Sequence, residues 1–235
     1  MIKNLSHASP AFYAAGMSLL TALLTVLALH FPHQIRLKTD AAHTTAAPLP
    51  PVRIALALDA RLPVAVSRPA IEEAAALWAP HGVEIVPLEA SAPCPLGDET
   101  IDAVLTVRIT DLSVGPGALS SPFASTRFLP DGRPEPTILL HYEALTSMAL
   151  GSVMLGGVQV SQWPPAGRDL VLARMIGRVL AHEIGHWLLR TRSHSSGGLM
   201  RAVHTTNELA DFGRAGFVLV PADVVRLREV LTTRN

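Results

Sequence analysis

The segment His182-Glu183-Ile184-Gly185-His186 holds the residues whose chemistry is most clearly implied by this sequence. His182 and His186 are four positions apart, so on a helix both imidazoles project from one face, about one turn from each other. Two neutral imidazoles at that separation can bind one Zn2+ and leave room for further ligands. Glu183 is then placed beside the metal as a base for a bound water rather than as a ligand. The spacing therefore predicts a zinc site.

The residues around this motif are typical of a helix. No proline occurs from Asp169 to Leu189. Apolar residues recur there at three- and four-residue spacing and form one stripe, which consists of Ile176, Leu180, Ile184, Trp187 and Leu188. We therefore expect a helix over about 169–189 that buries this stripe and presents the two histidines together.

A catalytic zinc site uses three protein ligands and keeps one position open, so a third ligand must come from elsewhere. The candidates after the motif are His194, His204, Glu208 and Asp211. We favour His194, because the chain after Leu189 can turn sharply and return to the metal. Glu208 is the main rival, since the segment 207–211 resembles the N-E-x-x-x-D helix of thermolysin-like enzymes, one residue short.

A glycine pair and a methionine follow the favoured third histidine. Gly197 and Gly198 precede Met200 by three and two residues. This order fits a tight loop that passes under the metal and packs a thioether below the histidines.

With these residues in view, the chain resembles the metzincin clan of zinc metallopeptidases, which share the H-E-x-x-H motif, a nearby third histidine and a following methionine. More narrowly, the stretch AHEIGHWLLRTRSHSSGGLMRA is similar to a group of short, exported bacterial zincin-like proteins, and the similarity extends from Val179 to the C-terminus. Two departures stand out. Metzincins place the third histidine six residues after the second histidine, whereas here His194 comes eight residues after His186. Metzincins also place a glycine three residues after the second histidine, whereas position 189 here is Leu.

The resemblance implies an α+β zincin domain that hydrolyses peptide bonds in a peptide or protein substrate. In this interpretation His182, His186 and His194 hold Zn2+, and Glu183 is the general base for a zinc-activated water. An edge strand, placed at Gly117–Phe123, would hold the peptide extended across the cleft. Two other classes stay open: a zinc-binding zincin-like protein without turnover, with a structural or binding role at the cell envelope, and a membrane-anchored interaction protein without metal.

The elements that must position this site follow from hydrophobic patterning. Strands are expected at Arg53–Leu58, Val83–Leu88, Ala103–Ile109 and Thr137–Leu145, and helices at Arg68–His81, with Pro69 in its first turn, and at Pro221–Leu231, besides the motif helix. The order predicts a mixed, mostly parallel sheet backed by helices, with the motif helix after the sheet.

The N-terminal region predicts export. Ala11–Phe31 has no Asp, Glu, Lys or Arg and is long enough to cross a bilayer as one helix. We expect residues 1–32 to form a signal anchor or a cleaved signal peptide, 33–52 a tether rich in Pro, Ala and Thr, and 53–235 the metallopeptidase domain. The protein is then membrane-anchored or secreted. The alternative for 11–31 is a buried core helix.

Charge and cysteine content set further bounds. The 19 basic and 19 acidic residues balance, which gives no reason to expect a nucleic-acid partner. Cys94 is the only cysteine, so no disulfide forms within the chain. A role for Cys94 as a latency ligand of zinc is weaker than a plain loop or core thiol, because such cysteines precede the catalytic domain. The sequence does not specify an oligomeric state.

Overall fold

The computed structural model describes residues 51–88, 101–110 and 123–233. All of these belong to the compact unit Ala47–Asn235, and the other unit is Met1–Ala46. The predicted signal or membrane segment, Cys94 and most of the predicted edge strand Gly117–Phe123 lie outside the described residues, so they stay predictions. Within the described ranges, no helix is long and apolar enough to cross a membrane.

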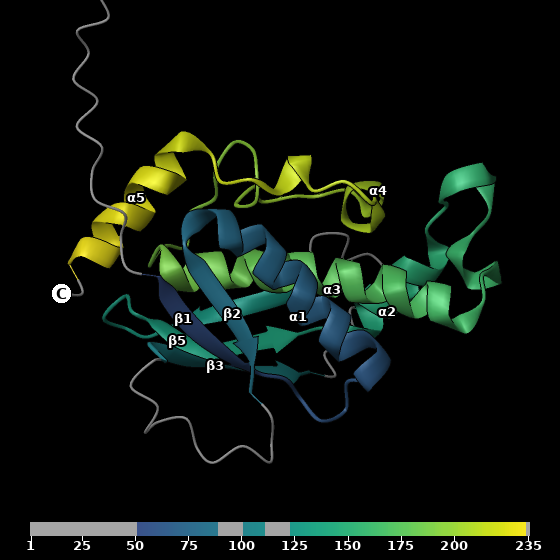
Figure 1. Cartoon of the computed structure of the whole chain (residues 1–235), viewed down its shortest axis with the longest axis horizontal. Helices are drawn as coiled ribbons and strands as arrows, with labels where there is room; N and C mark the ends of the chain where they lie inside the picture. The colour runs from purple at the N-terminus through teal and green to yellow at the C-terminus, as the bar shows by residue number, and fades with distance from the viewer. Residues whose placement is uncertain (1–50, 89–100, 111–122, 234–235) are drawn as a thin grey trace, which may run out of the picture. The chain divides into compact units, whose positions relative to one another are not determined.

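The sheet is built from short runs of apolar and β-branched residues. Its strands are β1 (Val52–Ala57), β2 (Val83–Pro87), β3 (Ala103–Ile109), β4 (Ala124–Phe128) and β5 (Pro134–Leu140). Over the described residues their order is β2-β1-β3-β5-β4, and all pairs are parallel except β4 with β5 (Figure 1). The expected mixed, mostly parallel sheet is confirmed, and β4 lies at its edge.

Helices back this sheet and carry the motif. They are α1 (Val64–Trp78), α2 (Tyr142–Gly151), α3 (Pro165–Leu188), α4 (Thr206–Ala210) and α5 (Pro221–Thr232). α1 contacts β2 and α3 contacts β4 and β5, while α1 and α3 pack against each other (Figure 1). The segment that follows α3 lies on the side of this helix away from the sheet (Figure 1).

The close approach of α1 and α3 fixes the motif helix in place. The predicted stripe is buried at Ile176, Leu180 and Ile184, as expected. The Trp78 indole at the end of α1 donates a hydrogen bond to the carbonyl of Ala181, at 3.0 Å. A Cβ added to Gly177 would lie 2.6 Å from the carbonyl oxygen of Ala70, so the helices touch backbone to backbone at this point.

Two elements differ from their prediction. The strand predicted at Thr137–Leu145 ends at Leu140, and α2 begins at Tyr142 and buries Leu145 and Ala149, four residues apart. β4 was not expected at 124–128, because its sequence ASTRF buries only Ala124 and shows no apolar alternation. Its pairing with β5, not its own pattern, makes it a strand.

The first helix also begins earlier than predicted. It starts at Val64, so Pro69 lies inside the helix rather than in its first turn. Proline cannot donate to the carbonyl four residues back, which is that of Ala65. Ala65 is exposed, so water can satisfy this carbonyl and the proline is tolerated.

The contact at Gly177 predicts a measurable cost for a single methyl group. Alanine normally favours a helix over glycine by about 1 kcal/mol. At Gly177, however, the added Cβ must push apart two backbones, so Gly177→Ala should lower the free energy of unfolding by about 1–3 kcal/mol. Urea denaturation measures the change. Gly151→Ala, whose Cβ would meet nothing within 4 Å, is the control and should keep or raise stability. Equal behaviour of the two variants would contradict the prediction.

Candidate metal centre

The last two turns of α3 present His182, Glu183 and His186, and the chain returns to place His194 beside them. One ring nitrogen from each histidine lies within 4.8 Å of the others. His186 is buried, His182 is half-buried and His194 is exposed. The structure thus brings together the three histidines predicted as ligands, close enough to bind a metal ion.

Backbone carbonyls determine which ring nitrogen of His182 and of His186 carries the hydrogen. The Nδ1 atom of His182 lies 2.7 Å from the carbonyl oxygen of Leu199, and that of His186 lies 2.7 Å from that of Thr191. A carbonyl oxygen only accepts, so each Nδ1 carries the hydrogen and each neutral ring keeps a lone pair on Nε2. Second-sphere hydrogen bonds of this kind orient metal-binding imidazoles.

The two lone pairs face each other, and this arrangement fits a metal ion. The Nε2 atoms of His182 and His186 are 3.1 Å apart. With no hydrogen between them, two lone pairs at this distance repel. Two ligands on one tetrahedral zinc at 2.0–2.1 Å are separated by about 3.3 Å, so a bound cation would remove the repulsion with little movement.

Burial favours the neutral form of two of the three histidines. Loss of hydration lowers the pKa of His182 to about 4, and it also lowers the pKa of His194. The neutral imidazole is the form that binds metal.

The turn after α3 explains how His194 reaches the site over eight residues without a glycine. Arg190 adopts the left-handed conformation, with φ 48°, where glycine usually stands. Arg226 of α5 donates through Nε to the carbonyl of Leu189, at 2.8 Å, and satisfies a free carbonyl at the helix end. The departure from the metzincin interval is thus accommodated by a side-chain cap.

The segment around His194 is held by α5. The Ser195 hydroxyl lies 2.7 and 2.8 Å from the two carboxylate oxygens of Asp223, which is buried at the start of α5. The Ser195 amide donates to the carbonyl of Met200, at 2.8 Å. These bonds close a small loop directly after His194.

Met200 lies where the sequence predicts it. Its side chain is buried, and a Cβ added to Gly185 would overlap the Met200 sulfur and touch the Trp78 ring. The thioether therefore packs against the motif helix between its two histidines. Gly198 takes a positive φ of 68°, which the tight turn before Met200 requires.

The rival third ligands lie outside the histidine cluster. The Glu208 carboxylate is 2.6 Å from Arg201 and accepts from the Thr205 amide at 2.7 Å, in the capping box of α4. The His204 ring stacks on Phe217, with centroids 4.8 Å apart. Asp211 is exposed at the end of α4. Among the described residues, none of the three joins the histidine cluster.

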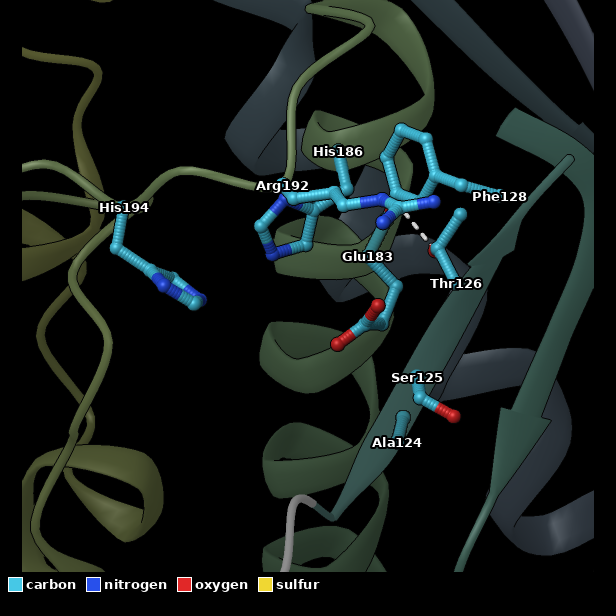
Figure 2. A pocket seen from close by; sticks show the side chains of 8 residues that line it. All are labelled: Ala124, Ser125, Thr126, Phe128, Glu183, His186, Arg192 and His194. Atoms are coloured by element: carbon cyan, nitrogen blue, oxygen red, sulfur yellow. Dashed lines mark hydrogen bonds between the residues drawn. The ribbon is translucent and has the colours of Figure 1, made fainter. Parts of the chain in front are cut away.

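Glu183 is buried beside the cluster, at 6% exposure, and its Oε2 has no hydrogen-bond partner within the described residues. Burial raises the pKa of this carboxyl. The side chain points into a cavity of about 310 Å3 that His186 and His194 also line (Figure 2). A carboxyl group with one oxygen free of hydrogen bonds to described residues, facing imidazole ligands, is placed to exchange a proton with a molecule in the cavity.

Sequence reasoning missed the opposite wall of this cavity. It is formed by Ala124, Ser125, Thr126 and Phe128 of β4, with Arg192 from the turn (Figure 2). The Thr126 hydroxyl donates to the backbone carbonyl of Glu183, at 3.1 Å, and links β4 to the motif helix. Only Arg192 had a signal in the sequence, because it lies inside the motif stretch.

The bond between Ser195 and Asp223 predicts an effect on metal affinity. Ser195→Ala removes the hydroxyl that holds the loop after His194, so the affinity for Zn2+ should fall about 10- to 100-fold. Competition with a chromogenic chelator measures it. Ser193→Ala, one residue before His194 and exposed, is the control and should keep parental affinity. Unchanged affinity in Ser195→Ala would show that the loop does not position His194.

No protein-family model and no curated protein matches this chain. Among solved structures, archaemetzincin from Methanopyrus kandleri is 15% identical with a TM-score of 0.46, covering 77% of this chain and 96% of that one. A zinc-dependent peptidase from Methanocorpusculum labreanum (strain Z) is 19% identical with a TM-score of 0.45, covering 74% and 99%. The function of this chain is therefore inferred from the geometry of its own site.

Proposed function

We propose that this chain is a zinc-dependent endopeptidase with His182, His186 and His194 as ligands and Glu183 as general base. One observation carries the proposal: the buried Glu183 carboxyl, whose Oε2 has no partner among the described residues, lies beside three imidazoles whose nitrogens converge, and Glu183, His186 and His194 open into one cavity. Three protein ligands with an open position are typical of catalytic rather than structural zinc sites.

The donor set supports zinc as the metal. Imidazole nitrogen suits Zn2+ among the divalent ions, and no thiolate or carboxylate belongs to the cluster in the described residues. When bound, Zn2+ supplies Lewis acidity, which polarises a carbonyl and makes a water acidic near neutral pH. The chain supplies the orientation, through the carbonyls of Leu199 and Thr191.

Glu183 would handle the proton. As a carboxylate it accepts a proton from the attacking water, and as an acid it gives that proton to the departing amine. Burial raises its pKa, which makes the carboxylate a stronger base for the first transfer. Because the Thr126 hydroxyl holds the Glu183 backbone, the base keeps a fixed place relative to β4.

The edge strand β4 would bind the peptide. The sequence predicts this role for Gly117–Phe123, most of which lies outside the described residues, and the described edge strand spans Ala124–Phe128. Its residues line the cavity, and within the described sheet only β5 pairs with it. An extended peptide can add to such an edge through backbone hydrogen bonds, which brings a scissile bond past Glu183.

We also propose that the domain works outside the cytoplasm. The support is the uncharged run Ala11–Phe31, which is long enough for a signal anchor or signal peptide. The domain would then act on peptides or proteins at the cell envelope or beyond it.

Zinc stoichiometry and peptide hydrolysis test the proposed function together. The purified protein should hold about one zinc per chain, lose it in His194→Ala and keep it in Glu208→Ala, whose carboxylate bonds the α4 cap and Arg201. Glu183→Ala should keep zinc and lose turnover of a pooled peptide library by about a hundred- to ten-thousand-fold.

Each failure has its own meaning. Zinc without turnover of any peptide would make the chain a zinc-binding protein with a structural or binding role. Loss of zinc in Glu208→Ala but not in His194→Ala would identify Glu208 as the third ligand in place of His194. Absence of zinc after reconstitution of a folded protein would remove the enzyme proposal.

A further inference from the structure

Arg192 occupies a defined place on the cavity wall. It lies in the turn between His186 and His194, and its guanidinium carbon is 4.9 Å from the centroid of the Phe128 ring. Phe128 is the last residue of the edge strand β4. Figure 2 shows the guanidinium beside this ring, in the cavity that Glu183 and both of these histidines also line.

The positive charge of Arg192 is not paired with a negative charge among the described residues. Of the residues that line the cavity, Arg192 is the only arginine and Glu183 the only acid, and the Glu183 carboxyl is buried and assigned to proton transfer. No described carboxylate forms an ion pair with Arg192. Elsewhere in the described segments, Arg178 and Arg214 pair with Glu73, and Arg201 pairs with Glu208.

Stacking on Phe128 orients Arg192 without consuming its donors. A guanidinium over an aromatic ring uses its face, while its N–H groups point outward in the plane and fit a carboxylate through two parallel hydrogen bonds. If the stack served only to hold the turn, any flat or aliphatic side chain could replace the arginine. The orientation of a cation into the cavity favours a role in binding.

The distance to the site limits which part of a peptide is met. Arg192 is two residues from His194, so their Cα atoms are within about 7.6 Å. A peptide paired with β4 advances about 3.4 Å per residue. Because Arg192, Glu183 and His194 line one cavity, a carboxylate held by Arg192 belongs to a residue close to the scissile bond.

We propose that Arg192 determines substrate preference by binding a carboxylate of the peptide close to the scissile bond. The carboxylate is an Asp or Glu side chain or the free C-terminus of the peptide. This inference rests on the proposed peptidase function, and it extends that function to acidic peptides as the substrate class.

The test compares peptides that differ only in charge. Pooled N-acetylated hexapeptide amides carry Glu, Gln or Lys at one fixed position, and a second set has free C-termini. With the full chain loaded with zinc, kcat/KM should favour Glu over Gln by about 10- to 100-fold at one or two positions. A preference seen only with free C-termini would identify the terminal carboxylate as the source.

Variants of Arg192 show whether this residue is the cause. Arg192→Gln should abolish the preference, Arg192→Lys should keep part of it, and Arg192→Glu should turn it toward Lys peptides. Arg228→Glu makes the same charge change on the exposed face of α5 and should leave the preference intact. Zinc content and the unfolding midpoint show that each variant is folded.

Binding to Glu183→Ala separates the two proposals. If no peptide is hydrolysed but Glu pools bind this variant more tightly than Gln pools, and Arg192→Gln removes the difference, then Arg192 binds carboxylates and the peptidase function fails. If peptides are hydrolysed while Glu and Gln pools react equally in the parent and in Arg192→Glu, the carboxylate proposal is overturned and the peptidase function stands.

Discussion

The buried guanidinium of Arg178 is the interaction on which the site depends. It lies on α3 one turn before His182 and bonds Glu73 of α1 at 2.9 Å. Its other nitrogens donate to the carbonyls of Glu208, at 2.5 Å, and Gly213, at 2.7 Å. A charge without exposure is costly unless every donor is satisfied. Here the satisfied charge joins the first helix, the motif helix and the C-terminal segment at one point.

Glu73, the carboxylate that pairs with Arg178, is also buried and depends on its hydrogen bonds. Burial alone would raise the pKa of Glu73, but hydrogen bonds from Arg214 and Arg178 outweigh it and hold the pKa below its usual value. Arg178 and Glu73 together fix the C-terminal segment against α3. This segment also supplies Leu199, whose carbonyl orients His182. The metal centre therefore depends on two contacts of one segment, the ionic anchor at Arg178 and the loop that carries His194.

Local patterning predicted much of this fold, while the long-range contacts stayed hidden. The motif helix, β1, β2 and β3 follow from apolar periodicity, and the histidines follow from their spacing along one helix face. The run TILLHYEAL is equally apolar as strand or helix, and only the structure divides it at His141. Arg178 looks like an ordinary polar position of a helix, because its partner Glu73 is 105 residues away.

The longer interval between His186 and His194 gives the site a feature that a shorter turn would lack. In the metzincin spacing, a glycine ends the helix early and the chain returns at once to the metal. Here Leu189 continues the helix, Arg190 takes the left-handed position, and Arg226 satisfies the carbonyl of Leu189. The additional residues carry Arg192 past the helix end and onto Phe128. The same change that replaces the glycine therefore places a cation on the cavity wall, beside the strand that would hold the peptide.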